Sequence, residues 1–483
     1  MTNIKTNVFR KFPRTFWVAN TIELFERFAW YGFFMLFANY LTRSTEVGGL
    51  EFSQSQKGII MGVGTGILYF LPVITGAIAD KWGYKRVLLL SFVIYASAFI
   101  LIPLFNTFTG VFLIYLYLAV GAALFKPVIS ATIAKTTNSE TSSIGFGIFY
   151  MMVNIGSFMG PLLTLAFKGA SYDLVFYISA AIISLNFILI LFYNEPKHEV
   201  NDEPFADTLI TIGKNILTVF SDMKFVVFLV IVSGFWTMYL QLFFTLPVFI
   251  EQWVDTSNMV HYFSQHMPFI VENYSDGKQL DPEFLTNFDA LFIVLFQVMI
   301  SGFIMRWKAL SVMVSGFIVS TIGLSLTMIT QNPVFILAFM FIFAVGEMTS
   351  SPKITEYIGS IAPADKKALY MGYSFIPLFI GNILAGIVSG PVYERLSDLV
   401  SFAEKEAVNQ GFHMQESLSQ TEQINSLAAH MNMTHRELVN YLWINYNPSS
   451  IWMVIAAIGG LAAFSLLIYN KFFINTKSDI QVN

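Results

Sequence analysis

The sequence predicts an all-α membrane protein with twelve transmembrane helices in two six-helix halves, and three observations lead to this prediction. Of its 483 residues, 55% are hydrophobic and 12% are charged, and the mean hydropathy is +0.63. That composition excludes a soluble globular protein. Apolar runs of about 20 residues, enough to cross the hydrocarbon core of a bilayer, recur along the chain. A polar connection near the middle separates the first six runs from the rest.

The apolar runs define the predicted spans and their orientation. The spans lie at about residues 16–41, 55–79, 87–105, 108–134, 143–167, 172–193, 225–250, 286–305, 309–330, 333–361, 367–394 and 448–470. Lys and Arg are concentrated in the connections that share a side with the amino terminus. The positive-inside rule then places both termini in the cytoplasm, as in an integral protein of a bacterial cytoplasmic (inner) membrane.

The chain divides at its polar central connection. Residues 1–193 form the predicted amino-terminal half, 194–224 a cytoplasmic linker, and 225–483 the carboxy-terminal half. Two long outer connections, at about 251–285 and 395–447, interrupt the second half. Connections of this kind are more often lids or packing elements than binding sites.

The first span carries charges that a bilayer tolerates poorly. Glu23, Arg27 and Trp30 lie one helical turn apart in succession, with Glu26 and Tyr31 beside them. Charged groups at membrane depth cost a few kcal/mol each, so they mark functional sites by default. This face must therefore contact other protein or a water-filled cavity.

Four further motifs give the chain a family resemblance. The connection at 76–86, with Asp80 at its centre, resembles the signature loop of the major facilitator superfamily. The motifs at 23–32, 125–127, 146–158 and 346–363 resemble those of the proton-dependent oligopeptide transporter (POT) family of that superfamily. The resemblance covers all twelve spans and is clearest in the first six. It implies the major facilitator fold, with substrate bound near the midplane between two six-helix halves.

The resemblance also implies roles for individual residues. Arg27 and Lys126 would face the carboxylate of a short peptide, and Glu347 would face its amino group. Further side chains would line the substrate cavity: Trp30, Tyr31, Tyr69, Asn154 and Asp289. The residues implied in proton coupling are Glu23, Glu26, Arg27, Lys126, Glu347 and Asp289.

Several of these residues have simpler interpretations that the sequence leaves open. Asn154 could serve only as an interhelical hydrogen bond. Lys126 could extend along its helix to the cytoplasmic interface, and Tyr69 could be a packing residue. Glu347 has no basic neighbour one turn before it, which favours a proton or cation site over a structural role.

The chain departs from the family at positions that bear on its cargo. The family usually has an arginine in the stretch that here reads Phe33-Phe34 and an acid where this chain has Leu240, so that ion pair is lost as a unit. Asp289 stands where the family has asparagine; it either replaces the lost acid or caps the outer end of its helix. Lys353 and Glu356 are three residues apart on one span and are expected to pair.

Together these features predict a proton-coupled symporter, a divergent member of the family, that imports di- and tripeptides by alternating access. The alternatives are a transporter of a non-peptide solute and a non-transporting sensor. There are no cysteines, and the sequence contains no nucleophile–base constellation or run of metal ligands. We expect no enzyme activity, no metal, no cofactor other than the coupling proton and no nucleic-acid partner. The expected partners are a short peptide or similar zwitterion, protons and the bilayer, with the chain acting as a monomer.

Overall fold

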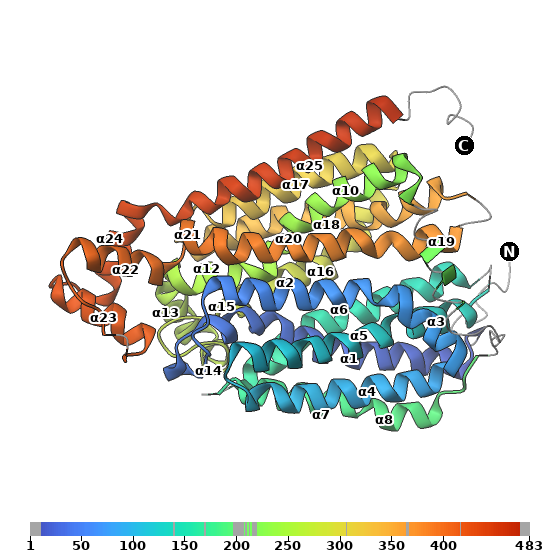
Figure 1. The fold of residues 1–483 in the computed structure, drawn as a ribbon, viewed down its shortest axis with the longest axis horizontal. Coiled ribbons are helices and arrows are strands. Elements are labelled where there is room, and N and C mark those ends of the chain that lie inside the picture. Colours follow the sequence, from blue (N-terminus) through green and yellow to red (C-terminus); the bar gives the residue numbers. More distant parts are fainter. Residues whose placement is uncertain are drawn as a thin grey trace. The chain divides into compact units, whose positions relative to one another are not determined.

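The structure is a computed structural model that describes residues 11–138, 141–168, 171–196, 207, 210–211, 213–214, 220–305, 307–363, 367–415 and 417–473. Its elements are helices (Figure 1). The first group comprises α1 (Arg14–Thr42), α2 (Gln54–Phe70), α3 (Pro72–Trp82), α4 (Tyr84–Leu101), α5 (Phe108–Lys135), α6 (Ser142–Lys168), α7 (Asp173–Ser184) and α8 (Asn186–Leu189).

The second group of helices begins after the central connection. It comprises α10 (Met223–Tyr239), α11 (Gln241–Phe244), α12 (Leu246–Trp253), α13 (Ser257–His266), α14 (Pro268–Tyr274), α15 (Pro282–Thr286), α16 (Phe288–Ile304), α17 (Ala309–Thr327) and α18 (Pro333–Ile361). It ends with α19 (Lys367–Gly372), α20 (Ile376–Ile387), α21 (Tyr393–Leu396), α22 (Leu399–Asn409), α23 (Gln420–His430), α24 (His435–Tyr446) and α25 (Ile451–Phe473).

These helices account for the twelve predicted spans. In the described part of the chain, 10 helical segments are long and apolar enough to cross a membrane, and α2 with α3 makes an eleventh if the bent pair is one span. Helix α1 has 29 residues, which is long enough, but its charged side chains lower its hydropathy. The all-α prediction with twelve transmembrane helices is confirmed.

Several predicted spans are not single straight helices, and two of them have a marked break or kink. The second breaks before Pro72, where α2 and α3 meet at 44° because proline removes a backbone donor. The eleventh contains a π-helical turn at Val388–Val392, which includes Pro391 and is kinked at Gly390. The outer connection predicted as 251–285 is also partly helical. It holds α13 and α14, and the eighth span begins at Pro282.

Contacts group the chain into two compact units. The first contains residues 1–33, 67–167 and 173–219, and the second contains 34–66, 168–172 and 220–483. The outer portions of α1 and α2 thus group with the carboxy-terminal helices, where "outer" means the side predicted to face outside the cell. The division into halves at 194–224 stays a prediction.

In the first unit, α4 packs between α5 and α7, and α3 packs on α5 (Figure 1). Helices α1 and α6 cross closely, because a Cβ on Gly160 would lie 2.4 Å from the carbonyl oxygen of Phe28. Small residues allow this approach between helices in a membrane.

The signature loop is held by hydrogen bonds within the first unit. Gly83 adopts a positive φ of 92°, which a glycine tolerates, and α4 begins directly after it. Glu195 accepts hydrogen bonds from the backbone amides of Tyr84 and Lys85, at 2.5 and 3.4 Å. Its carboxylate therefore caps the positive end of α4. Asp80 accepts a hydrogen bond of 3.0 Å from the Tyr84 hydroxyl.

In the second unit, α10 packs against α17, α20 and α25, while α18 packs against α16 and α17. The outer connection that follows α21 folds into three short helices, α22 to α24, that pack on one another. Ser419 with Glu422, and Thr434 with Glu437, form capping boxes that start α23 and α24. The local sequence therefore encodes these two outer helices.

Candidate functional site: two buried carboxylate clusters

The first cluster is built on α1 in the first unit. Arg27 donates two hydrogen bonds to the Glu26 carboxylate, at 2.5 and 2.7 Å, and its Nε lies 3.2 Å from Glu23. Tyr95 of α4 donates a further hydrogen bond to Glu26. Glu26 is fully buried, and Glu23 and Arg27 are each 6% exposed. The i, i+4 spacing predicted from the sequence thus produces a buried ionic cluster.

Lys126 extends this cluster from α5. Its ammonium lies 4.5 Å from the centre of the Tyr69 ring, a cation–π contact. It also interacts electrostatically with Arg27, Glu26 and Glu23. This position, over an aromatic ring inside the unit, differs from the extended conformation that would carry the ammonium to the interface. Tyr69 therefore does more than pack, since its ring faces a cation.

The two carboxylates of the first cluster are not equivalent. Glu26 receives three hydrogen bonds from Arg27 and Tyr95, whereas Glu23 has one ionic contact with Arg27, at 3.2 Å. A carboxylate held by fewer donors loses less when it takes up a proton. Glu23 is therefore the less tightly held carboxylate of this cluster.

Of the remaining predicted side chains of the first unit, Tyr31 contacts this cluster. The Tyr31 ring centre is 5.9 Å from the Arg27 guanidinium carbon. Trp30 is buried, with its ring edge-on to Phe33. The Asn154 amide donates a 2.9 Å hydrogen bond to the carbonyl of Tyr150, so this bond lies within α6 and is not interhelical.

The second cluster lies in the second unit and is acidic. Tyr239 of α10 donates a 2.8 Å hydrogen bond to Glu347 Oε1 on α18. The carboxyl group of Asp289, near the start of α16, is in hydrogen-bonding contact with that of Glu347. No side chain caps α16. Of the two roles that the sequence left open for Asp289, the structure does not show the helix cap, and the side chain contacts Glu347.

The other expected ion pair also forms. Lys353 Nζ lies 2.7 Å from a carboxylate oxygen of Glu356, one turn along α18. Lys353 is buried while the Glu356 carboxylate is largely exposed. The aliphatic part of the Lys353 side chain is therefore buried in the unit, while its ammonium group pairs with a carboxylate at the surface of the unit.

Aromatic side chains make the contacts of Phe34, in the stretch where the sequence departs from the family. The Phe34 ring centre lies 5.6 Å from that of Phe243 and 6.1 Å from that of Phe244. Leu240 is buried beside them on the same helical run. The outer part of α1 is thus joined to the seventh span by apolar contact. Sequence comparison indicated the loss of the pair but not what replaces it.

A buried polar network, which sequence reasoning missed, holds the outer end of α1 in the second unit. Arg43 pairs with Glu251 and donates a 2.8 Å hydrogen bond to the Tyr172 hydroxyl. Asn39 donates a 2.7 Å hydrogen bond to the fully buried Glu283. Burial raises the pKa of Tyr172 well above its usual range, so this hydroxyl stays protonated.

Lys57 holds the outer end of α2 in a similar way. It is fully buried, and its ammonium donates to Gln54 Oε1 at 2.8 Å and to the carbonyl of Phe244 at 2.9 Å. Gln54 in turn donates to Asp398, at 3.0 Å. A single lysine after a polar loop gives no sequence signal of such burial.

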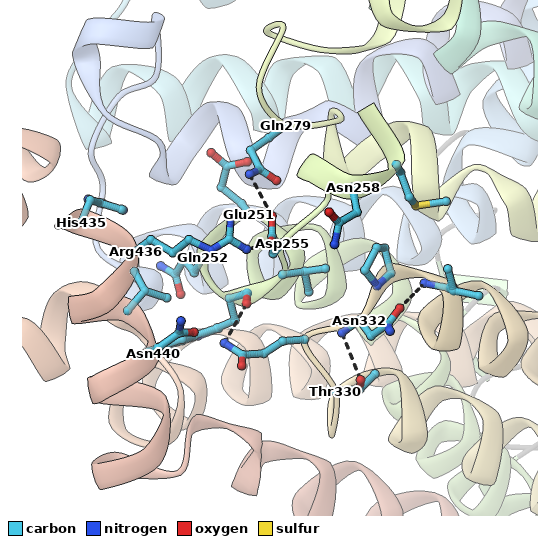
Figure 2. A pocket seen from close by; sticks show the side chains of 17 residues that line it. Glu251, Gln252, Asp255, Asn258, Gln279, Thr330, Asn332, His435, Arg436 and Asn440 are labelled. Atoms are coloured by element: carbon cyan, nitrogen blue, oxygen red, sulfur yellow. Dashed lines mark hydrogen bonds and ion pairs between the residues drawn. The ribbon is translucent and has the colours of Figure 1, made fainter. Parts of the chain in front are cut away.

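The outer connections enclose a cavity of about 700 Å³ within the second unit (Figure 2). Arg436 of α24 pairs with Asp255, and Gln279 donates a 3.2 Å hydrogen bond to the same carboxylate. None of the predicted site residues lines this cavity. The described residues also contain no group of three or more His, Cys, Asp or Glu placed to hold a metal ion.

Comparison with known proteins gives the chain its relatives. The sequence pattern of the Major Facilitator Superfamily matches residues 21–386. The peptide transporter YePEPT of Yersinia enterocolitica is 31% identical over 149 residues, 29% of each chain. Dipeptide and tripeptide permease A of Escherichia coli is 30% identical over 166 residues, 34% of this chain and 32% of the permease. The alignments thus span about a third of each relative's length.

Solved structures share the fold over almost the whole chain. The crystal structure of a peptide transporter POT in complex with alafosfalin superposes with a TM-score of 0.68 at 16% identity, covering 96% of this chain and 94% of that one. The nucleoside transporter NupG superposes with a TM-score of 0.64 at 15% identity, covering 94% and 99%. The predicted resemblance to the Major Facilitator Superfamily is confirmed, its members are transporters and not enzymes, and the relatives named above include peptide transporters.

Proposed function

Because the chain belongs to the Major Facilitator Superfamily, we propose that it is a symporter that imports di- and tripeptides together with protons, by alternating access. The observation that carries this proposal is the buried cluster of Glu23, Glu26 and Arg27. Burial of charged groups within a membrane costs free energy, so their presence marks a functional site. The similarity to a peptide transporter and to a dipeptide and tripeptide permease supports the choice of cargo.

Proton coupling would operate through exchange of partners around Arg27. When Glu23 is ionised, Arg27 is shared between two carboxylates. Protonation of Glu23 removes one of these negative charges, and the guanidinium and the Lys126 ammonium are then available to an anion. A substrate carboxylate supplies that anion, since arginine binds carboxylates through charge-assisted hydrogen bonds. Proton binding and carboxylate binding thereby favour each other.

The other end of the peptide needs an anionic site. Glu347 fits this role because its described partners are a tyrosine hydroxyl and a second carboxyl group, not a cation. Tyr31, Tyr69, Trp30 and Asn154 would complete the polar and aromatic lining around the peptide backbone. A zwitterion needs a cation at its carboxylate and an anion at its ammonium group.

The energetics allow substantial accumulation. One proton that moves down a potential of about 100 mV releases about 2.3 kcal/mol. Since about 1.4 kcal/mol corresponds to a tenfold ratio, one proton supports roughly fifty-fold accumulation of a zwitterion. Accumulation of this size requires a membrane with a proton gradient and a potential, and we propose that this is the bacterial cytoplasmic membrane. Both termini would lie in the cytoplasm. The chain would act as a monomer without a nucleic-acid partner.

Uptake into proteoliposomes tests the proposal. Labelled dialanine is presented with an inward proton gradient and an inside-negative potential, and protein-free liposomes serve as the control. We expect accumulation that collapses when an uncoupler is added. Absence of uptake by protein that elutes as a single species and melts cooperatively would overturn the peptide assignment.

A second candidate is transport of another small solute. One observation that favours it is the apolar contact of Phe34 with Phe243 and Phe244, since the family has an ion pair in these stretches. The other is the presence of Asp289 in the second cluster. Stabilisation against heat by a solute other than a peptide, in a screen of zwitterions and small anions, would select it. A sensor without transport activity is disfavoured because the buried cluster on α1 has no evident purpose in one.

A further inference from the structure

The pair of carboxyl groups formed by Asp289 and Glu347 has an unusual environment. Asp289 is the second residue of α16 and is 5% exposed. Neither its Oδ1 nor Glu347 Oε2 accepts a hydrogen bond from a described donor. The Tyr239 hydroxyl supplies one hydrogen bond, to Glu347 Oε1. Two buried carboxyl groups thus meet with a single neutral donor between them.

The surroundings of the pair offer no compensation for two negative charges. An apolar group of side chains packs between α16 and α18: Ile293, Phe292, Phe296, Ala344, Val345 and Met348. The polar side chain there is Gln297, which is uncharged and donates a 3.4 Å hydrogen bond to the carbonyl of Met348. Lys353, two turns further along α18, is engaged by Glu356. Glu283 of the adjacent α15 accepts a hydrogen bond from Asn39. Helix α17, which also packs on α18, contains no ionisable side chain.

Electrostatics then dictates the protonation of the pair. Two carboxylates in contact cannot both be ionised in an apolar site, because their repulsion is not screened. A single proton placed between them turns one carboxyl into a donor and relieves the repulsion. Two buried carboxyl groups that meet in this way are therefore stabilised by a proton, and separation of the two groups into water would release it, since a hydrated carboxyl group is ionised at neutral pH.

We propose that Asp289 and Glu347 share one proton and form a second proton-carrying site, which is loaded when α16 and α18 bring the two groups together and emptied when the transport cycle hydrates them toward the cytoplasm. This inference rests on the proposed symport and deepens it: two protons accompany each peptide, one at Glu23 and one at this pair. The pair keeps one negative charge when loaded, which matches the single ammonium group of a peptide.

Infrared spectroscopy of the purified protein tests the shared proton without any substrate. At neutral pH the wild type should show the carbonyl stretch of a protonated carboxylic acid. Asp289→Asn keeps a side chain that can donate to Glu347, so the fold is preserved while the shared proton is lost. We expect the band to disappear in Asp289→Asn and Glu347→Gln. The control Glu272→Gln, an exposed acid of the outer connection, should retain it.

The transport consequence is measured as the voltage dependence of accumulation. With dialanine and no pH gradient, two protons per peptide give an accumulation on the order of 2,000-fold at about 100 mV, and one proton gives about fifty-fold. We expect Asp289→Asn to fall from the first value to the second, whereas Glu272→Gln does not change.

The outcomes separate this inference from the proposed function. Accumulation that corresponds to one proton per peptide in the wild type would overturn the second proton site while leaving symport intact. So would accumulation that corresponds to two protons per peptide in Asp289→Asn. A protonated-carboxyl band that persists in both variants would overturn it too. If the wild type does not transport dialanine, the proposed function fails, and the infrared band alone decides whether the pair holds a proton.

Discussion

Replacement of each acid on α1 by its amide should separate structure from coupling. Glu26→Gln removes the carboxylate that receives two hydrogen bonds from Arg27 and one from Tyr95, all within a fully buried site. Removal of one partner from a buried ion pair costs about 3–5 kcal/mol, because the other charge stays buried. Glu23→Gln removes only a contact of 3.2 Å and leaves Arg27 paired with Glu26.

The loss from Glu23→Gln should therefore be smaller, about 1.5–3 kcal/mol at most for a hydrogen bond to a charged group. Its main effect should be on proton coupling and not on stability. Since glutamine cannot take up a proton, Glu23→Gln should leave only the proton shared by Asp289 and Glu347, and voltage-driven accumulation of dialanine should fall from about 2,000-fold to about fifty-fold. It should retain exchange of labelled for unlabelled dialanine across the membrane, which needs no net proton movement. Glu26→Gln should lose stability first, and transport only as a consequence.

The assay combines chemical unfolding in detergent with the two transport measurements in proteoliposomes. Glu272→Gln provides a matched acid-to-amide change at an exposed position. Full pH-dependent accumulation in Glu23→Gln would refute the assignment of the proton to that residue. Wild-type stability in Glu26→Gln would show that the bidentate contact does not hold Arg27 as the structure indicates.

Three further variants probe other contacts. Lys126→Gln should show a smaller preference for dialanine over its carboxy-terminal amide, because Arg27 remains as the one cation of the pair; an undiminished preference for the free acid would contradict this. Lys57→Ala leaves two buried acceptors without a donor and should cost about 1–3 kcal/mol in unfolding measurements; an unchanged unfolding free energy would show that water replaces the ammonium. Gly160→Val should abolish folded protein on size exclusion, since even a Cβ would clash with α1, and normal yield would disprove the close crossing.

Hydropathy and charge spacing were sufficient to predict the spans and the cluster on α1. A run of about 20 apolar residues has few structural options in a bilayer, and the i, i+4 relation of Glu23 to Arg27 follows from helix geometry. The pairing of Lys353 with Glu356 was predictable for the same reason, and the structure confirms it. Each of these features is local, so sequence separation alone determines the contact.

Contacts between distant helices were not predictable in this way. Tyr95 resembles any aromatic residue in an apolar span, yet it donates to Glu26 from 69 positions along the chain. Lys57 lies near the start of α2 and gives no sign that its ammonium reaches the carbonyl of Phe244. Asp289 was ambiguous between a cap and a partner for another carboxyl, since both occur at helix starts. Only the packing of α16 on α18 distinguishes them.

The net charges of the two clusters indicate which step of the transport cycle the membrane potential drives. With Lys126 and Arg27 both cationic, the cluster on α1 sums to zero when Glu23 and Glu26 are ionised, and to +1 when Glu23 binds a proton. The pair in the second unit sums to −1 when it shares a proton and to −2 when it does not. The loaded sites therefore total zero with a zwitterion, and the empty sites total −2. An inside-negative potential then does little to the loaded transporter but drives the return of the empty one, so exchange should be insensitive to voltage while net uptake is not.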